Sequence, residues 1–267
     1  MGDDAGLFGP GSTAWRLHAH PGLLVGGVRA LMLQALHPLA IAAVEQHSQY
    51  REDVWGRFQR TSDYVVTTVF GDRAAAQEAG RRVRAVHRRI RGVDPVTGLA
   101  YSAEDPELLL WIHMVLVDSF VVAYRRFAGR LPKSAADAYV GEMVRQAELV
   151  GLRLADVPAT YREMVERLRG YRSQLRITEP ARDGLQLLFH PPESPLRPPA
   201  WRLVVAGAIT LLPHWARGMY GLKGYGPLEP AVALSIRAGS WWTRRYRQPP
   251  PVLREARVRA EAAGLPI

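Results

Sequence analysis

Hydrophobic residues along this chain recur with the period of an α-helix almost everywhere. Apolar positions three and four residues apart mark one helix face after another, and alternating patterns typical of strands are nearly absent. The segment 108–127 is apolar nearly all round, so we expect it at the centre of the core. Asp105, Pro106 and Glu107 supply an N-cap, a first helical position and a first-turn acid in front of it. The pattern predicts an all-α protein.

Prolines and glycines predict where the N-terminal helices break. The segment 22–47 reads as one long apolar helix interrupted at Pro38, because proline disfavours helical geometry in the residue before it and removes a backbone donor. Within it, Gly26 and Gly27 would allow close approach of another helix or of a flat ligand. A second pair of helices, 57–70 and 73–91, is separated at Gly71–Asp72.

The C-terminal half has the same helical character. Residues 92–103 form a loop rich in Gly, Pro and Asp, and a Pro-rich turn is expected after His190. Further helices are expected from Ser134, from Pro158 to about Gln174, from Thr178 to before His190, over 201–212 and over 227–246. We expect a flexible lead at 1–11, one helical domain at 12–247, and a charged, peripheral tail at 248–267.

The formal net charge of +10 changes this picture little. Lys133 and Lys223 are the only lysines among the 35 basic residues, so arginine supplies the rest and is scattered over nearly every helix. No nucleic-acid recognition motif accompanies the charge. The arginine and alanine content is typical of a GC-rich coding genome, and we expect no nucleic-acid partner.

Several kinds of site are excluded by what the sequence lacks. With no cysteine, disulfides, zinc–cysteine sites, thiolate ligation of haem and cysteine nucleophiles are all ruled out. The motifs HExxH, GxSxG, the P-loop and paired Glu-x-x-His are also missing, which removes most support for hydrolase, nucleotide-binding and di-iron functions.

The N-terminal sequence and the apolar runs bear on location. MGDDAGLFGPGS lacks a basic stretch followed by an apolar core. The two longest apolar runs, 108–117 and 203–212, fall short of the roughly 18 residues of a membrane span. We expect a cytoplasmic protein, and peripheral contact with a membrane stays open.

His87 is the first candidate among the eight histidines. It lies along the apolar stripe of the expected helix 73–91, with Arg84 one turn before and Arg91 one turn after. A neutral imidazole can ligate iron, and guanidinium groups suit carboxylates such as haem propionates. The alternative is a partly buried histidine amid a solvated arginine face, and the pattern alone does not separate the two.

His113 is the second candidate. It sits in the most apolar segment, where it could ligate a metal or hydrogen-bond to Asp118, Ser119 or a backbone carbonyl. The pattern favours the core histidine. A third feature is a polar trio, Arg57, Arg60 and Thr61, on one side of an otherwise apolar and aromatic segment.

Taken in order, these segments resemble a known family. The features are LMLQALHPLAIAAVEQHS at 31–48, RFQRTSDYVVTTVFGD at 57–72, VRAVHRRIRG at 83–92, YSAEDPELLLWIHMVLVDSFVVAYRRF at 101–127 and WRLVVAGAITLLPHWARGMYGL at 201–222. Together they are similar to the catalytic domain shared by rubber oxygenase, the latex-clearing protein, and the fungal MpaB-type oxygenase. The resemblance covers about 12–245.

The resemblance implies a helical, globin-like domain around a buried haem b, which uses dioxygen to cleave carbon–carbon double bonds of isoprenoid chains. Arg84 and His87 match the R-x-x-H pattern that carries the family's proximal histidine. Arg57, Arg60 and Thr61 match the distal R-x-x-K-T pattern, with arginine in place of lysine.

That replacement implies an open or water-filled distal position, because arginine stays charged and is a poor ligand. Ser119 stands where the family has a threonine. Glu45 is the nearest counterpart of the acidic residue near the distal pocket.

The expected function is therefore a haem b-dependent oxygenase that acts with dioxygen on a small hydrophobic isoprenoid- or lipid-like alkene. Without a secretion signal, an extracellular polymer is not the expected substrate. The alternatives are a non-catalytic haem- or lipid-binding helical protein and, outside both haem functions, a helical scaffold or nucleic-acid partner.

Overall fold

The computed structural model describes residues 4–48, 50–192 and 198–265, and helices make up nearly all its regular structure. The helices are α1 Thr13–His18, α2 Leu23–Gln34, α3 Pro38–His47, α4 Val54–Phe70, α5 Arg73–His87, α6 Pro106–Phe127, α7 Lys133–Leu149, α8 Tyr161–Gly170, α9 Glu179–Phe189, α10 Pro198–Leu211, α11 His214–Tyr220, α12 Glu229–Tyr246 and α13 Pro251–Ala262. Short 3₁₀ turns lie at Leu154–Asp156, Tyr171–Gln174 and Gly226–Leu228. The all-α prediction is confirmed apart from one small sheet.

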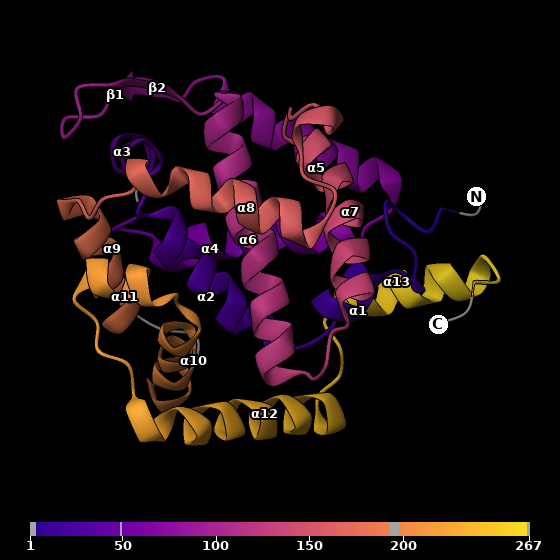
Figure 1. Cartoon of the computed structure of the whole chain (residues 1–267). Coiled ribbons are helices and arrows are strands. Elements are labelled where there is room, and N and C mark those ends of the chain that lie inside the picture. The colour runs from indigo at the N-terminus through magenta and orange to yellow at the C-terminus, as the bar shows by residue number, and fades with distance from the viewer. Residues whose placement is uncertain (1–3, 49, 193–197, 266–267) are drawn as a thin grey trace.

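Helix α6 runs through the middle of the molecule (Figure 1). Asp105 caps it through a side-chain bond to the backbone of Glu107, and Pro106 occupies its first turn, as the sequence predicts. Its side chains are buried over most of its length, and it packs against α2, α7, α8 and α12. The expectation that this segment forms the centre of the core is confirmed.

The contact between α2 and α6 depends on one of the two adjacent glycines. A methyl group placed on Gly26 would lie 2.9 Å from the Ser119 carbonyl oxygen and 3.0 Å from the Ala123 side chain, whereas one on Gly27 would meet nothing within 4 Å. Close approach of a second helix is therefore confirmed at Gly26, and Gly27 faces open space.

Gly26→Ala is expected to lower the free energy of unfolding by about 1–3 kcal/mol, because the added methyl group forces α2 away from α6. Gly27→Ala is the matched control on the same helix. It should be neutral or stabilising by up to about 1 kcal/mol, because alanine favours the helix where nothing obstructs it. Urea unfolding of both variants measures the difference, and equal effects would contradict the proposed steric cause.

The predicted interruption at Pro38 is present and sharp. Helix α2 ends at Gln34, α3 begins at Pro38, and the two axes differ by 100°. His37 forms the extended N-cap of α3, as expected for a residue that precedes proline. This bend carries α3 away from α2 and toward the two strands.

The segment 57–91 differs from expectation at its end. The break at Gly71–Asp72 is confirmed, with Asp72 capping α5. However, α5 ends at His87, and Arg91 begins a strand instead of the next helical turn. The predicted loop 92–103 holds the rest of an antiparallel hairpin, in which β1 Arg91–Val93 pairs with β2 Ala100–Ser102. The prediction of one helix over 73–91 is wrong because cross-strand hydrogen bonds compete for these backbone groups.

The later helices come in the expected order, but some of them begin at other residues than the sequence predicted. Helix α9 begins after the Thr178 cap and ends before His190, as predicted. Helix α7 begins after Pro132, before Ser134, and α8 begins at Tyr161 through a capping box with Thr160 and Glu163. Most of the Pro-rich turn, 193–197, lies outside the described residues.

Both ends of the described chain pack onto the domain. Phe8 is buried, and the Asp4 carboxylate accepts a bond from the Arg73 backbone. At the other end α13 packs on α4 and buries Leu253, Ala256 and Ala260 (Figure 1). These three residues share one helical face, so a charged segment still offers an apolar stripe.

Among the described residues, α6 is long and apolar enough to cross a membrane, with a mean hydropathy of 1.7 over 18 residues. The bent pair α2 and α3 would pass the same test as one span. Of that α6 stretch, 72% is buried inside the protein, which is the usual situation of a core helix.

Candidate functional site

His87 is the last residue of α5 and is half-buried. Its Nδ1 atom is buried and has no hydrogen-bond partner among the described residues. Burial lowers the pKa of the imidazole, and the charge of Glu104 opposes this only in part. The ring is therefore neutral near pH 7, the form in which histidine binds a metal.

Arg84 lies one turn before His87 and points toward α7, where its guanidinium donates to the carbonyl of Leu149. It also lies close enough to Tyr64 on α4 to influence its hydroxyl. Burial raises the pKa of Tyr64 above its usual range, while the Arg84 charge lowers it. The Tyr64 hydroxyl, like Nδ1 of His87, is buried without a partner in the described part of the chain.

Tyr64 was not among the residues singled out from the sequence. The signal was available, because Tyr64 follows Arg57 and Thr61 at the i+7 and i+3 positions and so continues one face of α4. Helices α4 and α5 pack directly against each other. They therefore supply two buried polar groups, on Tyr64 and His87, that have no partner among the residues that the structure describes.

The structure divides the predicted trio on α4. Arg57 is half-buried and donates to the Ser48 hydroxyl at 2.8 Å, and burial together with the Arg60 charge lowers its pKa. Arg60 is exposed and pairs with Asp53 at 3.0 Å. Thr61 is also exposed, and its hydroxyl donates to the Arg57 carbonyl at 3.1 Å. Of the three side chains, only that of Arg57 is partly buried. Arg60 lies at the surface, where it pairs with Asp53, the N-cap residue of α4.

Glu45 lies on α3 and is already engaged by neighbouring side chains. It accepts a bond from the Tyr50 hydroxyl at 2.8 Å and pairs with Arg51, which also reaches Asp183 at 2.6 Å. Burial first, and then the bond to Glu45, raises the pKa of Tyr50. Ser48, the partner of Arg57, directly follows α3. Glu45 therefore lies close in the chain to the residue that Arg57 contacts.

Arg91 does not flank His87 on a helix, contrary to the sequence-based expectation. Its side chain is exposed on β1 and pairs with Glu104 at 3.2 Å. Its carbonyl accepts a bond from Nε2 of His47 at 3.1 Å. The correction follows from the end of α5 at His87, since a residue beyond the helix no longer follows its face.

His113 and Ser119 lie in the core on α6. Burial lowers the pKa of His113 to about 4. The Ser119 hydroxyl accepts a 2.6 Å bond from Arg29, whose guanidinium also pairs with Asp118 at 2.8 Å. Ser119 thus belongs to the hydrogen-bond network around the buried ion pair of Arg29 and Asp118, which joins α2 to α6.

The low pKa of His113 predicts acid sensitivity. Because the folded pKa lies below the unfolded value of about 6.5, the unfolded chain binds more protons between these two values. The contribution of His113 to stability is therefore lost progressively as pH falls from about 6.5 to about 4, and it changes no further below that.

Urea unfolding between pH 7 and pH 4 tests this prediction. His113→Leu should flatten the pH dependence by about 1.4 kcal/mol per pH unit in this window. The exposed His214, replaced by leucine, serves as the matched control. An unchanged slope in His113→Leu would contradict the assignment.

The described residues contain no group of three or more His, Asp or Glu side chains that could hold a metal ion by themselves. A prosthetic group that brings ligands of its own makes no such demand on the protein.

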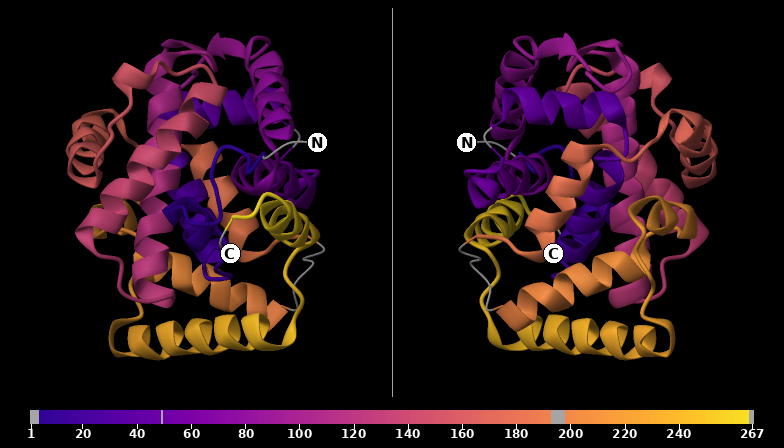
Figure 2. Two further views of the ribbon diagram at one scale, coloured as in Figure 1. Left: turned by 90° about the vertical axis from the view of Figure 1, so that its right-hand side faces the viewer. Right: turned by 90° about the vertical axis from the view of Figure 1, so that its left-hand side faces the viewer.

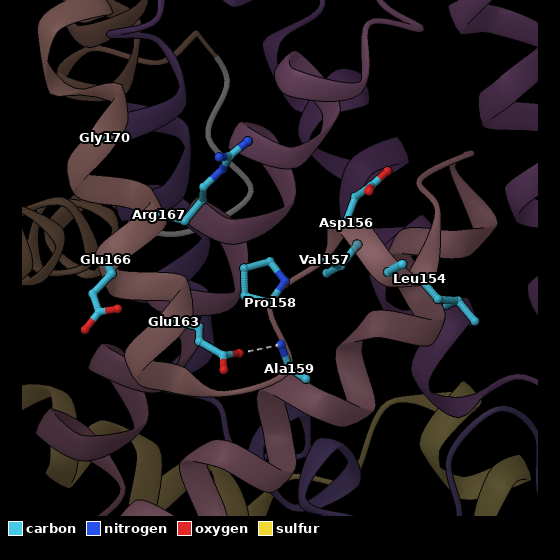
Figure 3. A pocket seen from close by; sticks show the side chains of 10 residues that line it. Leu154, Asp156, Val157, Pro158, Ala159, Glu163, Glu166, Arg167 and Gly170 are labelled. Atoms are coloured by element: carbon cyan, nitrogen blue, oxygen red, sulfur yellow. Dashed lines mark hydrogen bonds between the residues drawn. The ribbon is translucent and has the colours of Figure 1, made fainter.

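A surface hollow of about 740 Å³ lies elsewhere, between the 3₁₀ turn at Leu154–Asp156 and α8 (Figure 3). Its polar groups are committed to local structure. Glu163 accepts bonds from the backbone of Ala159 and Thr160, and Asp156 pairs with Arg153 at 2.7 Å. None of the residues predicted for the site lines this hollow.

A comparison with known protein families assigns this chain to one of them. Residues 15–245 match the model of the family described as "ER-bound oxygenase mpaB/B'/Rubber oxygenase, catalytic domain". The chain belongs to this family. The resemblance inferred over about 12–245 is thereby confirmed, and membership of an oxygenase catalytic-domain family supports oxygenase activity and hence oxidoreductase chemistry. No curated protein and no solved structure matches the chain.

Proposed function

We propose that this member of the oxygenase family binds haem b through His87 and uses dioxygen to oxygenate or cleave a hydrophobic isoprenoid- or lipid-like alkene. The observation that carries the proposal is the buried Nδ1 of His87, which has no protein partner among the described residues. A buried polar atom without a partner is costly, and a bound ligand would remove that cost.

The side chains around His87 fit such a group in part. The neutral imidazole suits an iron ligand, and Arg84 and Arg57 are partly buried guanidinium groups on the two adjoining helices. Arg91, Arg60 and Thr61 are exposed, whereas Arg84 and Arg57 are partly buried. We therefore assign propionate binding to Arg84 and Arg57, and a globin-like enclosure of the haem to α4, α5 and the helices around them.

The haem would supply the binding and activation of dioxygen. The protein's own share is positioning and polarity. His87 would hold the iron, and Arg57 keeps its charge, because the guanidinium group stays protonated in proteins. The Tyr64 hydroxyl, whose pKa is raised, stays protonated and can donate a hydrogen bond to a group placed between α4 and α5.

The distal side follows from Arg60. Arginine does not lose its proton and does not ligate iron, and here its side chain is paired with Asp53. We therefore propose that Arg60 would not serve as a ligand of the haem iron. The substrate that we propose is a small hydrophobic alkene, and the location that we propose is the cytoplasm.

Expression with added iron and haem precursor tests the proposal. A purified protein with a Soret band and about one haem per chain is expected, and a colourless protein would contradict haem dependence. Oxygen consumption with isoprenoid alkenes then tests catalysis. A haem-loaded protein that consumes no oxygen with any alkene would favour the non-catalytic haem- or lipid-binding alternative.

A further inference from the structure

Helix α12 exposes large apolar and aromatic side chains to an unusual degree. Leu234 is 68% exposed, Trp241 63% and Tyr246 62%. Trp242 is half exposed, and Leu228 adds an exposed leucine just before the helix. Three other tryptophans, Trp15, Trp111 and Trp201, are buried. Among the described residues both exposed tryptophans, Trp241 and Trp242, lie on α12, and large apolar side chains exposed together on one helix mark an interaction surface.

The patch has the geometry of an amphipathic helix. Ala233, Ile236 and Ser240 are buried at spacings of three and four and hold α12 against the domain. The opposite stripe contains Leu234, Ala238, Trp241 and Arg245, at spacings of four, three and four. Helix α12 lies along the outer edge of the molecule in both views of Figure 2, so no other described element covers this stripe.

The surroundings of the patch are strongly basic. Between 223 and 254 the chain carries six basic residues, Lys223, Arg237, Arg244, Arg245, Arg247 and Arg254, and one acidic residue, Glu229. Glu229 is occupied by Arg217. The patch therefore offers positive charge with no acidic side chain of its own on the exposed face of α12.

Cations and aromatic rings are interleaved at the end of the helix. The Arg245 guanidinium lies 5.4 Å from the Tyr246 ring, and that of Arg247 lies 5.8 Å from the Trp242 ring. Trp241 and Trp242 each lie 6.0 Å from Tyr246. These contacts form one aromatic and cationic cluster at the surface.

This combination matches the chemistry of an anionic membrane surface. Tryptophan and tyrosine are favoured at the level of lipid headgroups, where an apolar ring and a polar tip both find partners. Arginine beside them pairs with lipid phosphates, and an amphipathic helix with a basic flank lies in the interface plane. A folded protein partner would need acidic pockets that match the positions of these side chains. A membrane needs only negatively charged headgroups and an apolar layer beneath them.

We propose that the outer face of α12 docks on anionic lipid bilayers. Leu234, Trp241 and Trp242 insert among the headgroups, and Arg245 and Arg247 contact the phosphates. The inference does not depend on haem, since it rests on α12 alone. If the proposed function is also correct, the same contact would bring the enzyme to the phase in which apolar alkenes dissolve.

Co-sedimentation of the full chain with vesicles tests this proposal. The probes are vesicles of phosphatidylcholine alone and vesicles with added phosphatidylglycerol. We expect binding to the anionic vesicles, at least tenfold weaker binding to the neutral ones, and a blue shift of tryptophan emission on binding. Raising the salt concentration should weaken binding, because screening removes the charge attraction.

Variants locate the contact. Leu234→Ser combined with Trp241→Ser should lower partitioning at least tenfold, and Arg245→Gln with Arg247→Gln should remove most of the preference for anionic vesicles, at about fivefold per arginine. Leu154→Ser and the pair Arg162→Gln and Arg169→Gln replace exposed residues of the same types on other elements and should have no effect.

Three outcomes would overturn the proposal. The first is no binding to anionic vesicles, and the second is equal loss in the control variants. The third is a change of oligomeric state in the α12 variants, seen by light scattering, without vesicle binding, which would mark the face as a contact between copies of the chain.

Discussion

Replacing Arg29 with methionine is expected to lower the free energy of unfolding by about 3–5 kcal/mol, because it leaves a buried carboxylate without its counter-charge. Arg29 is 3% exposed and donates to Asp118 at 2.8 Å, to Ser119 at 2.6 Å and to the Leu211 carbonyl at 2.9 Å. Asp118 in turn accepts from the Tyr161 hydroxyl at 2.9 Å. One guanidinium thus joins α2 to α6 and to the end of α10.

Denaturant unfolding of Arg29→Met against Arg60→Met measures this effect. The second variant removes an arginine from an exposed pair with Asp53, where solvent screening limits the loss to about 0–1 kcal/mol. If Arg29→Met fails to fold, Asp118→Asn supplies the measurement, since asparagine still accepts from Tyr161 but carries no charge. Equal losses in the buried and exposed pairs would show that the buried network does not stabilise the fold.

Replacing His87 with alanine is expected to abolish haem binding. Loss of a residue that only orients a metal ligand typically weakens metal affinity by about 10–100-fold, and loss of the ligand itself should weaken it more. The loss of haem should therefore exceed this range, and the Soret band should disappear from protein purified after expression with haem precursor. Circular dichroism should change little, because His87 is the last residue of α5.

Two further variants distinguish ligation from packing. His113→Leu should keep the Soret band, because His113 lies in the apolar interior of α6. His87→Gly should regain haem when imidazole is added, because free imidazole can fill the vacated position and a packing defect would not respond to it. A band that survives in His87→Ala and disappears in His113→Leu would transfer the ligand assignment to His113.

The sequence predicted most of the helical framework from local signals. The N-cap at Asp105, the bend before Pro38 and the break at Gly71–Asp72 each rest on one residue and its immediate neighbours. Such signals act in the same way whatever the tertiary structure, because they reflect steric limits and unpaired backbone groups at helix ends.

The predictions that were wrong depended on distant partners. Whether the chain continues as helix beyond His87 is decided by pairing with residues 100–102, which the local pattern does not reveal. The contact of α13 with α4 also depends on two segments that are far apart in the sequence.

The surroundings of the predicted site residues also depend on distant segments. The sequence pattern placed Arg57, Arg60 and Thr61 on one side of α4, but it does not say which of these side chains the rest of the protein covers. In the folded protein Arg57 is half-buried, whereas Arg60 is exposed and pairs with Asp53. Similarly, Ser119 was a candidate from the family pattern, yet its partner Arg29 is 90 residues away in the chain.

The sequence by itself determined the helical class, the positions of the main breaks and the oxygenase family, because periodicity, caps and ordered motifs are properties of neighbouring residues. Only the tertiary structure decided that Nδ1 of His87 is buried with no partner in the described part of the chain, that Arg29 joins α2 to α6, and that the aromatic face of α12 points outward. Burial and charge pairing depend on which segments meet in space, and this follows from the packing of the whole chain.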